Sequence, residues 1–405
     1  MLWKLAWRNI WRNKRRTIIT AASILFAVLA AVSMNSIQRG VWDNMINSVV
    51  NSYFGFAQIH TKGYWDDRSI DKAFAFDANL QSLPEDSKTL KTLVPRIESF
   101  ALASSETMTK GALVIGVDPT LEDELTNLTS RIQEGEYLHE DDNAVLIAKG
   151  LAKDLKLGIG DTIVFVSQGY HGINAAGKYP VKGILNFPSP ELNRQMVYMP
   201  LKQAQWLYGA EGLVTSLALN IKDKNSVAPT LKAIESKVDT AIYELMDWQA
   251  MMPDLVQAKD MDTAGNQIML AVLYLIIAFG ILGTILMMTK EREYEFGVLV
   301  SIGMQRWRLA IMVWGEIVLL GIMGAIAGIL ASLPIVLYIH YNPIELSGEM
   351  AAAYDKFGIE PFILASLDLD IFYSQAILVV IITSVLALYP LLSIRRLKTV
   401  EAMRA

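Results

Sequence analysis

Four long apolar runs constrain this chain more than any other feature of its sequence. They cover Thr17 to Ile37, Ile268 to Met288, Leu309 to Ile339 and Phe372 to Ile394. Each run is close to or longer than the roughly 20 residues with which a helix crosses about 30 Å of hydrocarbon. The third run is longer and contains Pro334, near which we expect a kink or a helix end. The sequence therefore predicts a membrane protein with transmembrane helices at 17–37, 268–288, 309–339 and 372–394.

The charges around these runs indicate their orientation. Basic side chains are in excess in residues 1–16, 289–308 and 395–405, whereas acidic side chains outnumber basic ones in 38–267 and 340–371. Basic segments next to a span remain on the cytosolic side. A cleaved signal peptide is the alternative for the first run, but this run is long and no A-x-A site follows it. We therefore expect 1–16, 289–308 and the tail 395–405 in the cytosol, and 38–267 and 340–371 outside.

The long segment 38–267 predicts a water-soluble domain between the first and second spans. A mean hydropathy of +0.32 is too high for a soluble chain and too low for one that is mostly transmembrane. The chain has no cysteine, so this domain must be stabilised by its core alone. Runs typical of strands and of helices alternate in it, which predicts an α+β fold. The predicted strands lie near Phe56–His60, Ala112–Val117, Ala144–Ile147, Thr162–Ser167, Gln195–Met199, Ser216–Ile221 and Ala241–Leu245, and the predicted helices near Lys149–Leu155, Leu201–Tyr208 and Val227–Val238.

The segments that join this domain to the membrane also have helical patterns. The pattern continues from Trp42 to Val50 after the first span. It runs from Trp248 to Gln267 before the second span, with interruptions at Pro253 and Gly265. We expect both spans to extend outward as stalk helices, which could carry motion between the cytosol and the outside domain.

Three stretches carry a resemblance to a known family. They read WRNIWRNKRRT at 7–17, KEREYEFGVLVSIGM at 290–304, and YP followed by RRLKTVEAMR at 389–404. They are similar, in order, to the elbow helix, the coupling segment and the tail of the FtsX-like permeases, the ABC transporter family that includes the MacB and LolC/LolE proteins. Val300 and Thr399 depart from the family pattern, which often has arginine and proline at these places.

Within that family, residues 115–119, 147–161 and 199–205 most resemble LolC/LolE. The resemblance implies a permease that pairs with a second copy or a related chain over a dimer of ABC ATPase subunits. ATP and Mg²⁺ would then bind to the ATPase, and the first and second spans would line a central cavity. A periplasmic carrier or adaptor is a further implied partner. The carrier-binding hook would correspond to about 169–180, which lacks the usual proline–glutamine character.

The segment between the second and third spans is the candidate for ATPase coupling. Its apolar residues alternate with charged ones, which suits a short helix that docks an apolar face into a groove on a partner. A helix lying in the headgroups is the alternative, but three glutamates beside an anionic leaflet disfavour it. The residues to which we assign coupling are Glu291, Arg292, Glu293, Glu295, Phe296, Gly297, Val298, Leu299, Ile302, Gly303 and Met304.

Two further sets of residues have predicted roles in the membrane. Trp3, Trp7 and Trp11 recur every four residues among basic side chains, which predicts a helix anchored in membrane lipid at the interface. In the third span, Gly321, Gly324 and Gly328 would allow close helix packing, although glycine is also common in membrane helices.

Glu316 stands alone as a formal charge well inside a predicted span, which makes it a candidate for transport chemistry. It is about two turns from the cytosolic end, so pairing with a basic residue near Arg306 or Arg308 is the favoured interpretation.

Motifs for chemistry or nucleotide binding do not occur. The sequence has no G-x-x-x-x-G-K-[ST] phosphate loop, no H-E-x-x-H and no G-x-S-x-G. We therefore expect no catalytic residue, no metal site, no cofactor bound by this chain and no nucleic-acid partner.

These observations favour a permease subunit in the inner membrane of a bacterium, with a periplasmic domain. It would transmit ATPase motion to that domain and extract or move a lipoprotein or another amphiphile. Two alternatives are a MacB-like efflux permease and an FtsX-like regulator of a cell-wall hydrolase that moves no cargo.

Overall fold

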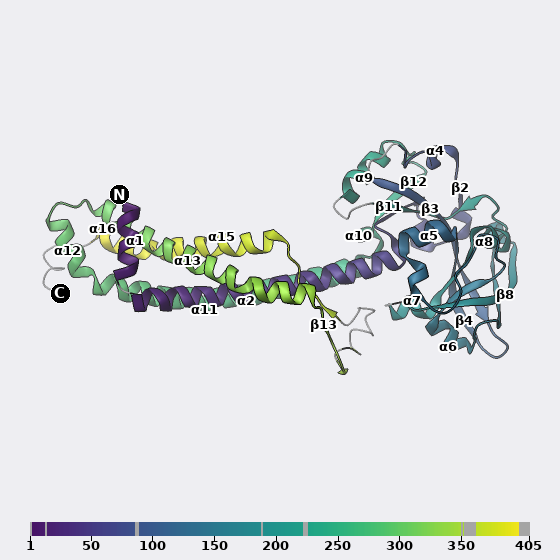
Figure 1. The fold of residues 1–405 in the computed structure, drawn as a ribbon. Coiled ribbons are helices and arrows are strands. Elements are labelled where there is room, and N and C mark those ends of the chain that lie inside the picture. The colour runs from purple at the N-terminus through teal and green to yellow at the C-terminus, as the bar shows by residue number, and fades with distance from the viewer. Residues whose placement is uncertain are drawn as a thin grey trace. The chain divides into compact units, whose positions relative to one another are not determined.

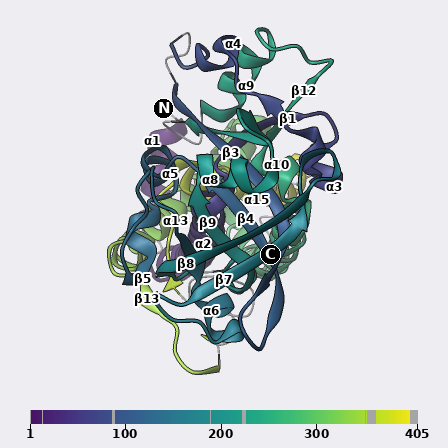
Figure 2. The same ribbon diagram turned by 90° about the vertical axis from the view of Figure 1, so that its right-hand side faces the viewer.

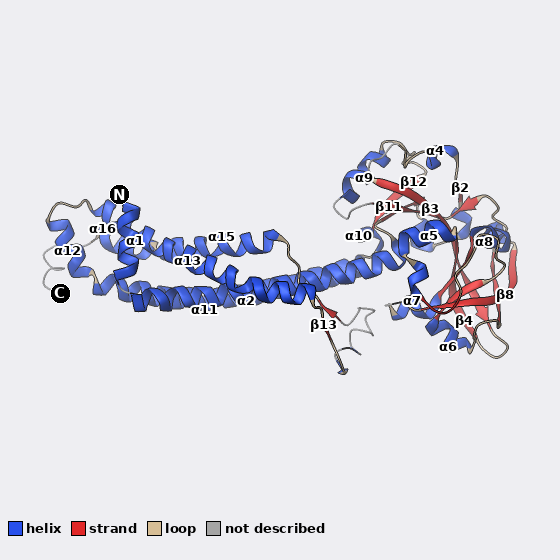
Figure 3. Cartoon of the chain, viewed as in Figure 1, coloured by secondary structure: helices blue, strands red, loops and turns tan. Residues whose placement is uncertain are grey.

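The computed structural model describes residues 2–12, 14–85, 89–187, 189–221, 226–349, 351 and 362–396, with side chains from Ala6 onward. The chain divides into two compact units. Unit 1 comprises Met1–Asp43, Ala258–Glu345 and Phe362–Ala405, and unit 2 comprises Asn44–Gln257 and Leu346–Pro361. Unit 1 is almost entirely helical, whereas most of the strands belong to unit 2 (Figure 3).

The helices of unit 1 follow the apolar runs of the sequence. Among the described residues, four of them are long and apolar enough to cross a membrane. Their apolar side chains share one core, which includes Val28, Ile285, Val313 and Val379. The elements are α1 (Leu2–Arg12), α2 (Lys14–Val49), α11 (Pro253–Glu291), α12 (Glu293–Ser301), α13 (Arg306–Tyr341), β13 (Ile344–Glu345), β14 (Phe362–Ile363), α15 (Leu369–Leu386) and α16 (Leu388–Arg395), as labelled in Figure 1 where space permits.

Prolines and glycines act differently from the sequence-based expectation. Pro334 does not end the third helix, which continues to Tyr341. Gly265 does not interrupt α11, and Pro253 occupies its first turn, where a missing N–H costs nothing. The fourth run, in contrast, is broken at Ala387 between α15 and α16. Pro390 has no backbone N–H, so it cannot donate the hydrogen bond that a continuous helix would make to the carbonyl four residues earlier. The missing bond accounts for this break.

Unit 2 is built on one large mixed sheet, and Figure 2 shows it from a second side. The ten strands run in the order β12-β1-β11-β3-β4-β9-β6-β8-β5, and β7 pairs with both β3 and β8. The pairings β3–β4–β9–β6–β8–β7–β3 therefore form a closed ring. The strands of this sheet are β1 (Ala57–Thr61), β3 (Leu90–Ser104), β4 (Thr109–Val117), β5 (Ile132–Gly135), β6 (Val145–Ala148), β7 (Thr162–Gln168), β8 (Asn174–Leu185), β9 (Met196–Pro200), β11 (Ser216–Ile221) and β12 (Tyr243–Asp247).

Short helices cover this sheet, and a small strand pair adds to it. The remaining elements of unit 2 are η1 (Val50–Phe54), α3 (Tyr64–Asp67), η2 (Ile70–Lys72), β2 (Phe74–Ala75), α4 (Ala78–Gln81), α5 (Pro119–Thr126), η3 (Leu128–Arg131), α6 (Lys149–Leu155), η4 (Tyr170–Gly172), α7 (Pro190–Gln195), α8 (Leu201–Tyr208), β10 (Leu213–Val214), α9 (Val227–Glu235) and α10 (Trp248–Met251). Strand β2 pairs with β10, and a separate core that includes Ile97, Phe165 and Val197 fills the space beside the ring.

Two strands of the ring have no counterpart among the predicted elements. β3 and β8 are the longest strands of the sheet, and each contains a proline, Pro95 or Pro180. β3 also contains the charged residues Arg96 and Glu98, which disrupt the expected apolar pattern. Residues 169–180, the predicted hook region, comprise η4 and the first half of β8, which pairs with β7.

Candidate functional site

The coupling segment is the short helix α12 with the turn that follows it. Gly303 has a φ of 101°, in the left-handed region that glycine adopts without strain. Its N–H donates to the carbonyl of Val300 at 3.1 Å, and the Met304 N–H donates to that of Leu299 at 3.0 Å. These two bonds form a Schellman motif, so Gly303 ends α12 and directs the chain into α13.

Phe296 corrects one part of the docking hypothesis. Its side chain is 1% exposed and belongs to the core of unit 1, with Leu299 and Met304 packed partly against it. It therefore holds α12 onto the chain's own helices, because an apolar ring is more stable in that core than in water. The apolar side chains that remain open on this segment are Ile302 at 76%, Tyr294 at 56% and Trp307 at 56% exposure.

Salt bridges connect the coupling segment to the N-terminal helix and to the start of α2. Arg12 donates to both carboxylate oxygens of Glu295, at 2.7 and 2.5 Å, and Arg16 donates to Glu291. Partial burial raises the pKa of Glu295, but Arg12 and Arg292 outweigh this effect, so that the pKa lies below its ordinary value. These pairs are partly exposed, and each contributes roughly 0–1 kcal/mol by itself. The first pair connects α12 to α1, and the second connects the end of α11 to α2.

Glu316 pairs with Arg292, which is a different partner from the one expected. The Arg292 guanidinium donates to its two carboxylate oxygens at 3.1 and 2.8 Å, and both residues are buried, at 9% and 4% exposure. Arg306 instead donates to the carbonyl of Arg395 at 3.4 Å and is exposed. The buried pair thus joins the junction of α11 and α12 to α13. The charge of Glu316 inside the span is neutralised by Arg292.

A cavity of about 280 Å³ lies among these ion pairs. Three arginines and three glutamates line it, together with Thr17, Thr20 and apolar residues of the spans. The charged lining residues are Arg12, Arg16, Arg292, Glu291, Glu295 and Glu316. Positive and negative charges are balanced here, so this site holds helices together without presenting a net charge.

Ion pairs join separate segments of the chain at each of the two ends of unit 1. Residues 1–16 contact 289–308 through Arg12 and Glu295. At the other end, Arg39 donates to Asp370 at 2.7 Å and to Asp368 at 3.3 Å. The segments expected on one side of the membrane therefore lie together.

The tryptophans of α1 lie on its exposed side. Trp7 and Trp11 are both exposed, and their ring centroids are 6.0 Å apart in an edge-to-face arrangement. Ala6 and Ile10 are buried on the other side of the helix. The side chain of Trp3 lies outside the described residues. Membrane anchoring by these indoles stays a prediction.

The glycines of α13 lie where other helices approach closely. A Cβ atom built on Gly324 would lie 2.6 Å from the Cβ of Ile24, and one on Gly328 would lie 2.7 Å from the Cβ of Val28. A Cβ atom built on Gly321 would lie 2.6 Å from Oγ1 of Thr383 in α15. Glycine therefore permits α13 to contact α2 and α15 at these positions.

We expect Gly324→Val to destabilise unit 1 by about 1–3 kcal/mol, because the added methyl groups must push α2 and α13 apart. Gly280→Val is the matched control, since nothing lies within 4 Å of a Cβ at that position. Thermal unfolding of the detergent-purified protein measures both. Equal melting temperatures for the two variants would contradict the packing role.

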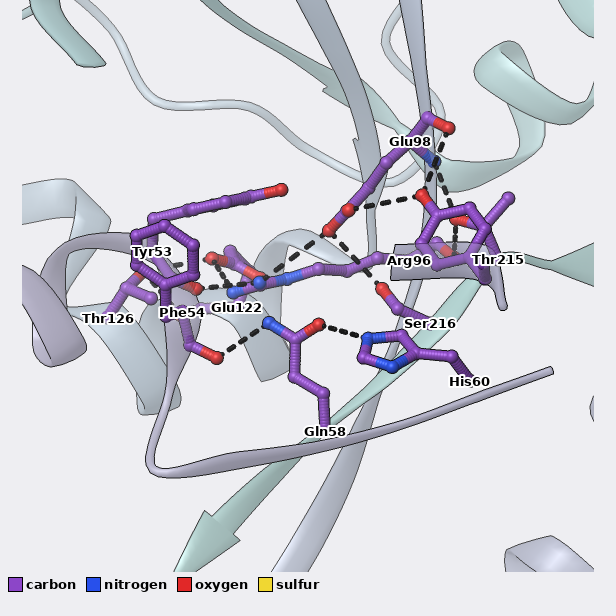
Figure 4. Close-up of polar contacts among 11 residues, drawn as sticks. Tyr53, Phe54, Gln58, His60, Arg96, Glu98, Glu122, Thr126, Thr215 and Ser216 are labelled. Carbon is purple, nitrogen blue, oxygen red and sulfur yellow. Dashed lines mark hydrogen bonds and ion pairs between the residues drawn. The ribbon is translucent and has the colours of Figure 1, made fainter. Parts of the chain in front are cut away.

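Unit 2 contains a buried polar cluster that the sequence patterns did not indicate (Figure 4). Arg96 of β3 donates to both oxygens of Glu122 of α5 at 2.8 Å and to the carbonyl of Tyr53 in η1 at 2.7 Å. Glu98 lies 3.8 Å from Arg96 and accepts a hydrogen bond from Ser216 at 3.2 Å. Burial alone would lower the pKa of Arg96, but Glu122 and Glu98 raise it above its ordinary value. This cluster fastens η1, where the stalk helix ends, to the central strand of the sheet.

His60 lies at the edge of the same cluster and is uncharged. Its Nε2 is 2.7 Å from Oε1 of Gln58, its ring stacks on Tyr64, and burial lowers its pKa to about 3. The unfolded chain binds a proton near the ordinary pKa of about 6.5. Stability should therefore be intact above about pH 6.5 and decrease as the pH falls toward 3, by about 1.4 kcal/mol per unit.

His60→Gln should remove this part of the pH dependence. Unfolding of the full chain by urea, measured at intervals from pH 7 to pH 4, tests it. An identical slope in the wild type and in His60→Gln would show that other groups cause the loss.

The described ranges contain no group of three or more acidic, histidine or cysteine side chains placed to hold a metal ion. What the geometry provides is a mechanical arrangement: a short helix, α12, attached to the neighbouring helices by ion pairs, and a stalk end attached to a sheet by a buried arginine.

Comparison with known proteins gives this arrangement a family. The MacB-like periplasmic core domain matches residues 17–237, and the FtsX-like permease C-terminal domain matches 267–399. The lipoprotein-releasing system transmembrane protein LolE of Haemophilus influenzae is 20% identical over 56% of this chain and 55% of its own. The macrolide export ATP-binding/permease protein MacB of Aggregatibacter actinomycetemcomitans is 24% identical over 79% of this chain and 50% of its own. The chain thus spans about half the length of these curated relatives.

Two solved structures are similar to part of the chain. The periplasmic region of MacB from Actinobacillus actinomycetemcomitans is 15% identical, with a TM-score of 0.36, over 50% of this chain and 93% of its own. The extracellular domain of the noncanonic ABC-type transporter YknZ from Gram-positive bacteria is 13% identical, with a TM-score of 0.34, over 47% and 99%.

The fold is that of a four-span membrane protein with a large α+β extracytoplasmic domain between the first and second spans, as predicted. The chain belongs to the MacB/FtsX/LolCE family of permeases. The family resemblance of the three sequence stretches is thereby confirmed.

Proposed function

We propose that this chain is the permease subunit of an ATP-driven transporter in a bacterial inner membrane. It pairs with a second permease copy or a related chain over two ABC ATPase subunits. ATP and Mg²⁺ bind to those subunits, since these 405 residues contain no phosphate loop. The match to an FtsX-like permease domain and the similarity to the permease relatives support this proposal.

The cargo that we propose is an amphiphile. The two curated relatives are named for lipoprotein release and for macrolide export, and both kinds of cargo have a large apolar part. A lipoprotein taken from the outer leaflet is our first candidate. Export of a small amphiphile is the second, because the MacB match extends over 79% of the chain.

The observation that carries the proposal is the way the coupling segment is held. Buried Phe296 and the Arg292–Glu316 pair attach α12 to the spans, while the Arg12–Glu295 pair attaches it to α1. A force applied to α12 would therefore reach α1 and α13 directly. The open apolar residues, Ile302 above all, are the part that we assign to the ATPase.

We expect Ile302→Asp to leave the protein folded and inserted, because this side chain is exposed, but to weaken its association with the ATPase by at least tenfold. An aspartate cannot enter an apolar groove without losing its hydration. Co-purification of the ATPase and cargo transport in proteoliposomes are the measurements. Ile159→Asp, which changes an exposed isoleucine of unit 2, is the control.

Several outcomes separate the functions. Normal association and transport in Ile302→Asp would show that this segment is not the coupling element. Loss of association with no cargo moved even by the wild type, but with activation of a cell-wall hydrolase, would indicate an FtsX-like regulator. Transport of macrolides without lipoprotein release would indicate efflux.

A further inference from the structure

A second cavity of unit 1 lies at the opposite ends of its helices from the coupling segment. It has a volume of about 650 Å³ and is lined by α2, α11 and α15, which Figure 1 labels. This volume lies in the range typical of small-molecule sites, roughly 300–1,000 Å³. Every residue of its lining belongs to unit 1.

The lining of this cavity changes from charged to apolar along the helices. Its charged side chains lie beyond or at the outer ends of the predicted spans, whereas several of its apolar side chains lie within them. The charged residues are Arg39, Asp43, Lys259 and Asp370, and apolar ones include Leu270, Ala271 and Leu378. An occupant should therefore have a polar head at the outer membrane surface and an apolar tail at the depth of the outer leaflet.

The charged part of the lining has two basic and two acidic side chains, and the two basic ones differ in the ion pairs that they form. Arg39 is occupied by Asp370 at 2.6 Å and by Asp368 at 3.3 Å. Lys259 makes no ion pair or hydrogen bond within the described part of the chain, although its side chain lines the cavity. Its ammonium is thus available to an anionic group, and the neighbouring carboxylates can accept a cationic one.

Uncharged polar side chains also line the cavity. Asn266 is 8% exposed, and its Nδ2 donates to Oδ1 of Asn35 at 2.8 Å. Below it, the Tyr274 hydroxyl donates to Gln375 at 2.6 Å.

We propose that this cavity binds one phospholipid of the outer leaflet through a zwitterionic headgroup. The phosphate lies at Lys259, the ammonium lies at the carboxylates of Asp43 and Asp370, and the first acyl carbons lie against Leu270 and Ala271. This inference goes beyond the proposed function, because it requires neither an ATPase nor a transported cargo.

The test is native mass spectrometry of the full chain in detergent micelles with added lipids of identical acyl chains. The lipids are phosphatidylethanolamine, phosphatidylglycerol and diacylglycerol. We expect phosphatidylethanolamine to bind most tightly, and phosphatidylglycerol and the phosphate-free diacylglycerol at least tenfold more weakly. Lys259→Gln should reduce phosphatidylethanolamine binding about tenfold, and Ala271→Phe should do the same by filling the apolar part. Lys290→Gln, on the same helix but outside the cavity, is the control.

Two results would overturn the proposal. Retention of phosphatidylethanolamine by both cavity variants at the wild-type level would show that the lipid is only annular. Equal binding of diacylglycerol and phosphatidylethanolamine would show that the charged lining recognises no headgroup. Failure of transport in the Ile302→Asp experiment would affect neither result.

Discussion

Replacing Arg96 by leucine is expected to destabilise the extracytoplasmic domain by about 3–5 kcal/mol, the usual cost of removing one partner of a buried ion pair. The variant would leave the carboxylates of Glu122 and Glu98 without their cation in the interior. It would also leave the carbonyl of Tyr53 without its donor. For a domain of this size the melting temperature should fall by about 10 °C.

Hydrogen exchange of β3 and α5 in the full chain, together with thermal unfolding, measures this effect. Lys110→Leu is the matched control, because Lys110 and Asp154 form an exposed pair at 3.8 Å. Its cost should stay below about 1 kcal/mol. The double variant Arg96→Leu with Glu122→Leu should recover part of the loss, since it removes both charges. A loss below 1 kcal/mol for Arg96→Leu alone would mean that the cluster is not buried in the native protein.

The Arg292→Leu variant should destabilise unit 1 by a similar amount, about 3–5 kcal/mol, because the buried carboxyl group of Glu316 would lose its ion-pair partner inside the helix bundle. It would also detach α12 from the third span. We therefore expect both a lower melting temperature and ATP hydrolysis that no longer moves cargo.

Arg308→Leu distinguishes this pairing from the one that the sequence suggested. Arg308 is exposed, so the free energy of unfolding of this variant should lie within about 1 kcal/mol of the wild-type value. The exchange of the two charges, Arg292→Glu with Glu316→Arg, should restore part of the stability. If Arg308→Leu is as damaging as Arg292→Leu, then the partner of Glu316 is wrongly assigned.

The two largest predicted effects share a physical cause. Each concerns an arginine that reaches from one element to a carboxylate on another, and all four of these side chains are buried. Arg96 connects a stalk end to a sheet, and Arg292 connects the coupling helix to a span. Both lie where motion would have to be transmitted, which is why loss of stability and loss of transport are expected together.

The sequence by itself determined the four spans, their orientation and the class of the outside domain. A span depends on the length of an apolar run and on the charges beside it, and neither depends on tertiary contacts. Strands such as β7 and β11 could also be predicted from the sequence. Buried residues alternate with more exposed ones in β7 and form a continuous run in β11, and both patterns are typical of strands.

Only the tertiary structure decided which side chains connect one helix or strand to another. Arg96 and Glu98 interrupt the apolar pattern of β3. They are buried there because Arg96 pairs with Glu122, which lies 26 residues away from it on a helix, and also lies 3.8 Å from Glu98. The direction of Phe296, inward, and of Ile302, outward, depends on how α12 packs, and its short amphipathic pattern fits either face. The pairing of Glu316 with Arg292 depends on α13 returning past the junction of α11 and α12. Local patterns report how residues meet water or lipid, whereas these pairings depend on which segments the fold brings together.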